Sequence, residues 1–318
     1  MEIIFIILTI LGLSLFEIIT SIDNAVINAD VLSGMGQKAR RFFLTWGFFF
    51  AVIVVRGVLP FLIILLALPG IGPFEILGVT LGGSPAAKEA IDEAAPALFM
   101  GGGVFLIFLF FNWLFLEPKN FGLRGEAFFQ RQGAWFFAIV SVILTFLVWF
   151  SLKTNPLLAF SAVVGSTAFF IIHGFRQYAE AQEEKLISKK SNISDAAKVA
   201  YLEVLDATFS IDGVIGAFAF TLFVPLILIG NGIGALVLRQ LTIKNIDKIR
   251  KYRFLKNGAM YSILFLGTIM IIDAFGFHVP TYVAPFIAFG TVGYFFYKSK
   301  VDLKTMSEDF INTKENKP

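Results

Sequence analysis

The chain has 318 residues, of which 57% are hydrophobic and only 15% are charged. Soluble domains carry about 45–50% apolar and about 25% charged residues, so this composition excludes an ordinary water-soluble domain. It also excludes a disordered or nucleic-acid-binding chain, and a net charge of +3 is weak evidence for an anionic partner. Cysteine is absent, which excludes disulfides, cysteine–zinc sites and iron–sulfur clusters. The mean hydropathy of +0.79 and the 39 phenylalanines predict an all-α polytopic membrane protein.

Apolar runs that are long enough to cross a membrane follow one another along the chain. A helix needs about 20 mainly apolar residues to cross the hydrocarbon, whereas the strands of a barrel alternate over about 10 residues. We therefore expect about nine transmembrane helices, the first and sixth interrupted by carboxylates. Met1-Glu2 has no basic region, so the first run is expected to be retained rather than cleaved as a signal peptide. The expected helices are 3–31, 43–68, 95–116, 133–152, 156–174, 199–223, 224–242, 255–276 and 281–298.

Lysine and arginine crowd alternate loops between these expected helices. The loops between these basic ones, which would lie on the other side of the membrane, hold only Lys88 and Lys153. Positively charged residues stay on the cytoplasmic side of a membrane, so we expect the N-terminus outside and the C-terminus inside. A polar stretch at 177–198 is expected to form a short amphipathic or solvated helix. The basic segments are 32–42, 117–132, 175–198, 243–254 and the tail after 298.

Two segments far apart in the chain share one acidic pattern. Each half of the chain also has an arginine inside its next apolar run, Arg56 in the first half and Arg239 in the second. The two copies are an odd number of crossings apart and would face opposite ways, which predicts an inverted three-helix repeat. The pattern reads Phe16-Glu17 with Ser21-Ile22-Asp23-Asn24, and Leu202-Glu203 with Asp206 and Ser210-Ile211-Asp212-Gly213.

The repeat predicts four parts of the chain. The first is a repeat half with three transmembrane helices, and the second contains two linking helices and a cytoplasmic polar linker. The third is the inverted repeat half with one extra helix, and the fourth is a charged cytoplasmic tail. The expected bounds of these parts are 1–132, 133–198, 199–298 and 299–318.

Carboxylates inside the apolar segments are the strongest functional signal. Each charge at the bilayer centre costs at least about 2.5–3.5 kcal/mol, so cations or protons must neutralise these groups. If these carboxylates paired only with Arg56 and Arg239, some of them would still lack a cation. The turn-type pairs Asp23-Asn24 and Asp212-Gly213 predict local unwinding, which would expose carbonyl oxygens beside the carboxylates. Oxygen donors of these kinds suit a hard divalent cation such as Mg²⁺, Ca²⁺ or Mn²⁺.

In these motifs, and over most of residues 10–298, the sequence resembles the TerC family of tellurium-resistance-associated integral membrane proteins, and within it a bacterial branch of unknown function. The resemblance implies membership of the lysine-exporter superfamily, whose members share inverted three-helix repeats, and a bacterial inner-membrane location. Several TerC-like proteins export manganese, so Mn²⁺ (or Ca²⁺ or Mg²⁺) is implied as a transported substrate and not as a tightly bound cofactor. Gly213 departs from the serine of many relatives. The implied metal ligands are Glu17, Asp23, Asn24, Glu203, Asp206 and Asp212.

We therefore expect a secondary transporter, not an enzyme, that exports a hard divalent cation through an acidic midplane site by proton antiport. The expected partners are the divalent cation, protons and membrane lipid, with no nucleic acid. Two alternatives stay open, an exporter of a cationic amino acid or small organic cation and a non-transporting membrane factor for metalloprotein assembly. A membrane metalloenzyme would use the same acids around a metal-bound water, but the chain has no His-Glu-x-x-His or Gly-x-Ser-x-Gly motif.

Overall fold

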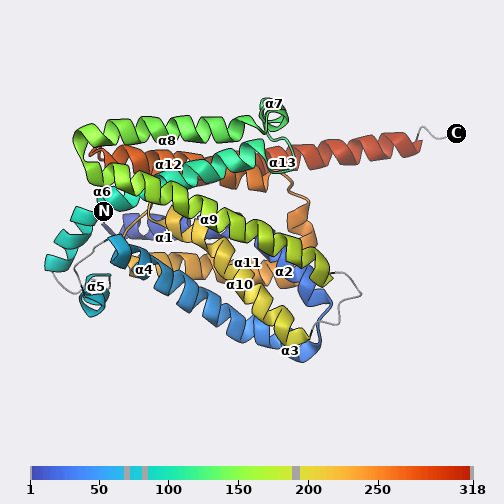
Figure 1. The fold of residues 1–318 in the computed structure, drawn as a ribbon. Helices are drawn as coiled ribbons and strands as arrows, with labels where there is room; N and C mark the ends of the chain where they lie inside the picture. The colour runs from blue at the N-terminus through green and yellow to red at the C-terminus, as the bar shows by residue number, and fades with distance from the viewer. Residues whose placement is uncertain (1, 68–71, 81–84, 188–193, 316–318) are drawn as a thin grey trace.

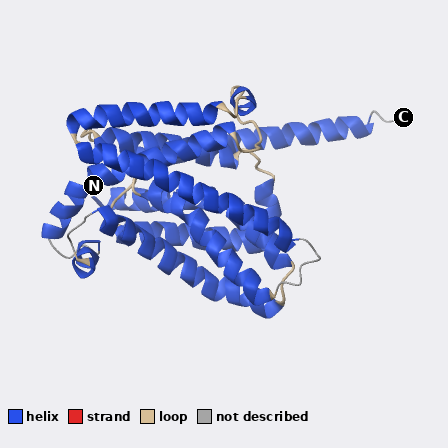
Figure 2. Ribbon diagram, in the orientation of Figure 1, coloured by secondary structure: helices blue, strands red, loops and turns tan. Residues whose placement is uncertain are grey.

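The computed structural model describes residues 2–67, 72–80, 85–187 and 194–315. Within these ranges every regular element is a helix, as Figure 2 shows by colour. The long helices lie side by side in one bundle (Figure 1). The elements are α1 (Glu2–Thr20), α2 (Ile22–Ser33), α3 (Gln37–Phe42), η1 (Phe43–Gly47), η2 (Phe50–Val58), α4 (Leu59–Ala67), α5 (Pro73–Thr80), α6 (Pro85–Phe115), α7 (Glu126–Arg131), α8 (Trp135–Thr154), α9 (Pro156–Ile187), α10 (Asp195–Ala217), α11 (Val224–Arg250), α12 (Leu255–Ala274) and α13 (Val283–Glu315).

Among the described residues, 7 helical segments are long and apolar enough to cross a membrane. They lie in α1, the run from α3 to α4, α6, α8, α9, α11 and α12, and they confirm the predicted all-helical, multi-pass character. The remaining two expected spans correspond to α10 and α13. Carboxylates interrupt the apolar sequence of α10, and lysine, tyrosine and glycine residues lower the hydropathy of α13.

The described residues of two expected polar segments continue the long helices. Helix α9 continues without a break to Ile187, and α10 begins at Asp195, so the stretch 177–198 is not a separate linking helix. Residues 188–193 of that stretch lie outside the described residues. The tail expected from 299 is likewise the second part of α13, which reaches Glu315 and extends beyond the bundle in Figure 1.

The unwinding predicted at Asp23-Asn24 and at Asp212-Gly213 does not occur at either pair. Helix α1 ends at Thr20 and α2 begins at Ile22, so Asp23-Asn24 lies within α2, and the break is the single residue Ser21. Helix α10 runs unbroken through Asp212-Gly213, so the second prediction was wrong. A Cβ atom at Gly213 would lie 3.1 Å from Glu17 Oε2, so this glycine serves a close approach of α10 to α1.

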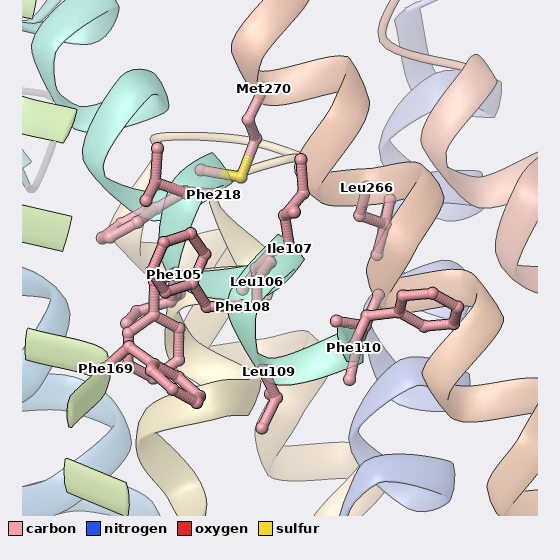
Figure 3. Close-up of a cluster of buried hydrophobic side chains, with 14 of the residues drawn as sticks. Phe105, Leu106, Ile107, Phe108, Leu109, Phe110, Phe169, Phe218, Leu266 and Met270 are labelled. Carbon is pink, nitrogen blue, oxygen red and sulfur yellow. The ribbon is translucent and has the colours of Figure 1, made fainter. Parts of the chain in front are cut away.

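Helix α6 lies at the centre of the bundle and packs closely against α9 and α12. Phe105 and Phe108 of α6 contact Phe169 of α9 edge-on, with ring centroids 6.0 and 5.7 Å apart (Figure 3). Where α6 and α9 cross, a Cβ atom at Gly165 would lie 2.8 Å from the Cα atom of Gly101. Membrane helices associate through such small residues, because lipid gives little hydrophobic drive for their packing.

Replacing Gly165 by alanine is expected to destabilise the protein by about 1–3 kcal/mol, because the added methyl group overpacks the crossing of α6 and α9. Thermal unfolding in detergent should show a clearly lower Tm for Gly165→Ala. Gly174→Ala is the matched control on the same helix, because a Cβ atom there would meet nothing within 4 Å. Equal Tm values for the two variants would contradict the close crossing.

Candidate functional site

A buried ionic cluster joins the two acidic motifs at the centre of the bundle. Arg56 of η2 donates from Nη2 to Glu17 Oε1 of α1 at 2.6 Å. Its other terminal nitrogen, Nη1, lies 3.7 Å from Asp206 Oδ2 of α10. The side chains of Arg56 and Glu17 are only 4% and 1% exposed, so this arginine balances carboxylates from both halves of the chain.

Local helix geometry positions this arginine. The element η2 is a π-helix, in which each turn is wider than in an α-helix, and such turns occur frequently at functional sites. Arg56 Nη1 donates to the carbonyl oxygen of Ala51 at 3.0 Å, so the guanidinium is also fixed to its own helix. On the opposite side, a Cβ atom at Gly234 of α11 would lie 2.7 Å from Glu17 Cβ. The absence of a side chain there lets α11 cover the glutamate.

A small cavity of about 80 Å³ lies beside this cluster, between α2, the run from η1 to η2, α10 and α11. Its surface is mostly apolar, and we call it the polar cavity for the polar side chains that reach it. Asn24 donates from Nδ2 to Asp206 Oδ1, which leaves Asn24 Oδ1 buried without a donor. Asn28 Oδ1 and both carboxylate oxygens of Glu203 are also buried without a donor. The polar residues that line the cavity are Ser21, Asn24, Asn28, Arg56, Glu203, Asp206 and Arg239.

Asp23 and Asp212 lie outside this cavity, each beside a different cation. Lys256 Nζ of α12 lies 2.7 Å from Asp23 Oδ2 and 2.8 Å from Glu117 Oε2. Arg176 Nη2 of α9 donates to Asp212 Oδ2 at 2.5 Å, and both side chains are largely buried. The aspartates of the two Ser-Ile-Asp motifs are therefore bound by cations of the protein itself.

The structure does not bring the expected metal ligands together in one centre. Four of them, Glu17, Asn24, Glu203 and Asp206, lie in or next to the cavity, and Asp23 and Asp212 do not. In the described part of the chain, no three acidic or histidine side chains gather closely enough to hold a metal ion. A centre of six ligands at these positions is therefore not formed in this conformation.

Sequence reasoning missed the cations that bind the two motif aspartates. Arg176 lies in the basic segment 175–198 of the sequence and Lys256 at the start of the expected helix 255–276, and in the structure they lie within α9 and α12. Glu117 follows α6 by two residues and lies at the start of the basic segment 117–132. The signal in the sequence was that Glu117, Arg176 and Lys256 each lie next to the end of a different expected helix, where they could meet the motif aspartates.

The charge network around Lys256 also affects Glu117. Burial, the largest single effect, favours the neutral form of this side chain, but Lys256, Arg176 and His173 together outweigh it and lower the pKa of Glu117 below its ordinary value. A depressed carboxyl pKa means that the ionised form stabilises the folded state. This stabilisation is fully present above about pH 4.3, the pKa of a glutamate in the unfolded chain. It is lost as the pH falls through the lower pKa that Glu117 has in the folded protein.

Removing the Arg56 charge is expected to destabilise the fold by about 3–5 kcal/mol, because Glu17 and Asp206 would stay buried without their cation. Arg56→Met keeps much of the side-chain volume, and thermal unfolding in detergent measures the loss. Adding Glu17→Gln to Arg56→Met should restore part of the Tm, since one buried negative charge is then removed. Arg41→Met is the control, because Arg41 is exposed on the same helical run. If Arg56→Met unfolds at the same temperature as the control, the cluster does not stabilise the fold.

Glu117→Gln is expected to lower the Tm at pH 7 relative to the wild type. The difference between the two proteins should shrink as the pH falls below about 4.3, where Glu117 of the unfolded wild type takes up a proton, and should vanish below the lower folded pKa. Thermal unfolding across this pH range makes the comparison, with Glu93→Gln as a control at an exposed position of α6. A difference that is independent of pH would show that the charge of Glu117 is not the cause.

Comparisons with known proteins add a family but no activity. No curated protein and no solved structure matches the chain. One family model matches residues 22–305, a range that includes every residue of the ionic cluster and the cavity except Glu17 and Ser21. Its description is "Protein of unknown function (DUF475)". Because this match covers most of the 318 residues, the chain belongs to the DUF475 family.

Proposed function

We propose that the chain is a secondary membrane transporter for a hard divalent cation, with Mn²⁺ as the first candidate, and that the ion binds in the cavity beside Arg56. The observation that carries this proposal is the set of buried oxygens without a donor. They belong to Asn24, Asn28 and Glu203, and they line one cavity together with Asp206. Carboxylate and amide oxygens are the ligands that Mg²⁺, Ca²⁺ and Mn²⁺ prefer.

The size of the cavity favours an ion over an organic substrate. Sites for small organic molecules usually enclose about 300–1,000 Å³. A space of about 80 Å³ suits a metal ion with a few waters and is too small for a cationic amino acid in this conformation. An organic cation is therefore the weaker candidate for this cavity.

The charges around the cavity support exchange of the ion with protons. Arg56 supplies one positive charge to Glu17 and Asp206 together, so these three groups and Glu203 carry two net negative charges beside the ion. Two carboxylates can be neutralised by one divalent cation or by two protons, which is the balance that antiport requires. Arg239 also lines the cavity, but its guanidinium lies 4.8 Å from the centroid of the Phe48 ring.

We further propose that α10 and α13 complete nine crossings and that the two halves form an inverted repeat. The starting end of α1 and the far end of α13 lie at opposite ends of the bundle, and α3 and α7, which belong to the basic segments 32–42 and 117–132, lie at the α13 end (Figure 1). The positive-inside rule then supports an external N-terminus and a cytoplasmic C-terminus. Glu17 and Arg56 of the first half would meet Asp206 and Glu203 of the second half near the midplane, where inverted-repeat transporters bind their substrates.

The resemblance to TerC proteins gives the proposed direction and location. Under this proposal the chain exports the ion across a bacterial inner membrane, and protons that enter in exchange drive the export. Asp23 and Asp212 are not ligands in the described conformation, since Lys256 and Arg176 bind them. The proposed ion site is therefore Asn24, Asn28, Glu203 and Asp206, with Glu17 acting through Arg56.

Ion flux in proteoliposomes tests this function. The wild type should carry saturable Mn²⁺ flux that responds to an imposed pH gradient, and Ca²⁺ and Mg²⁺ should be compared under the same conditions. Glu203→Gln keeps the shape of the side chain but removes its charge, so the flux should fall at least about tenfold, as expected for the loss of a buried charge contact.

Asp195→Asn is the matched control, because it removes one carboxylate from the same helix outside the cavity. Its side chain accepts from the Gly36 amide at 3.0 Å, which an asparagine oxygen can also do. Flux through this variant should equal that of the wild type. Absence of divalent-cation flux from folded wild-type protein would reject the proposal, and metalloprotein assembly would then be the next function to test.

A further inference from the structure

A second, much larger space opens on the outer side of α10. This groove has a volume of about 1450 Å³ and lies between α10 and the helical run from α3 to α4. It exceeds the range of about 300–1,000 Å³ of ordinary small-molecule sites. Most of its lining is apolar, and exposed aromatic side chains are prominent there. They are Phe42, Trp46, Phe49 and Phe50.

One carboxylate lies where this groove and the small polar cavity meet. Glu203 lines both spaces, and both of its carboxylate oxygens are buried without a donor. The side chain fits there because position 47 is a glycine: a Cβ atom at Gly47 would collide with Glu203 Oε1. Among the described residues that line the groove, Glu203 is the one acidic side chain.

We propose that the groove binds a lipophilic organic cation, an ammonium or phosphonium ion with a bulky apolar body, whose charge is bound by Glu203. The apolar walls would cover the body of the ligand, and the aromatic rings near Trp46 would attract its charge through their π-faces. A buried carboxylate without a donor is the complement that such a cation needs. The ligand would reach the groove from the lipid, because Trp46 and Val204 on its two walls are each 64% exposed.

Charge decides between this ligand and other occupants of the groove. An acyl chain of a phospholipid would cover the apolar walls but leave Glu203 without a partner. Lys38, the cation that lines the groove, precedes Gly47 by nine residues, so it lies roughly 13 Å further along the helical run. It is therefore too far from Glu203 to neutralise it and would suit a lipid headgroup at the membrane surface.

This inference does not depend on transport of a metal ion, although the two ligands would share Glu203. A divalent cation would approach this carboxylate from the polar cavity, and the organic cation would approach it from the groove. The two should therefore compete. Binding of the organic cation and flux of the divalent cation are separate measurements, so either proposal can fail while the other holds.

Binding of radiolabelled tetraphenylphosphonium to the full chain in lipid nanodiscs tests the proposal. The wild type should show saturable binding with one site per chain, above the partition into empty nanodiscs. Glu203→Gln should weaken this binding at least about tenfold, since a buried charge contact is lost. Asp195→Asn, on the same helix but outside the groove, should bind as the wild type does.

A second variant tests the groove without removing the carboxylate. Ala207 lines the groove, and Ala207→Trp should block binding by filling the space while Glu203 stays charged. Triphenylphosphine oxide, a neutral molecule with a similar apolar body, should not compete with the labelled cation. Equal binding by the wild type and Glu203→Gln, or equal competition by the neutral molecule, would show an apolar surface that only lipid fills. Cross-linking of Val204→Cys between two chains in the absence of the cation would show a second copy as the occupant and would also overturn the proposal.

Discussion

The buried guanidinium of Arg56 is the constraint on which the centre of this molecule depends. A charge in an apolar bundle is tolerated when opposite charges meet it, so α1 and α10 must bring Glu17 and Asp206 to η2. This requirement joins segments that are 182 residues apart, since Asn24 also donates to Asp206. The same convergence creates the polar cavity, because the helices that surround the cluster leave oxygen atoms facing one another beside it.

Close approach of helices makes this convergence possible. Glycines lie where helices cross near the cluster: Gly213 and Gly234 both face Glu17, and Gly47 faces Glu203. Lipid supplies little hydrophobic drive for association, so packing at such small residues and ionic contacts must hold the helices together. The pattern explains why glycines and buried carboxylates occur together in both halves of the chain.

The sequence predicted the helices and the burial of Glu17 and Asp212, but the side chain of Asp23 is 47% exposed, and the partners of these carboxylates were not predicted. Apolar length predicts a membrane span, because every backbone polar group must be satisfied within the helix. Pairing depends on side-chain contacts between distant segments, which the spacing of residues does not encode. Asp23 and Asp212 therefore looked equivalent to Asp206, although Lys256 and Arg176 bind them. Gly213 likewise looked like a turn residue, because its contact with Glu17 lies on another helix.

The under-wound turns of η2 have a mechanical consequence. A π-helix bonds each amide to the carbonyl group five residues earlier, and an α-helix bonds it to the one four residues earlier. If the hydrogen bonds of this stretch shifted from the fifth to the fourth residue earlier, the stretch would tighten by one residue. The side chains that follow would then rotate by about 100° about the helix axis. Arg56 lies near the end of η2, so such a rotation would carry its guanidinium away from Glu17. The ion pair between Arg56 and Glu17 and the π-helical winding of η2 therefore depend on each other. Breaking the ion pair would let η2 rewind, and rewinding η2 would break the ion pair.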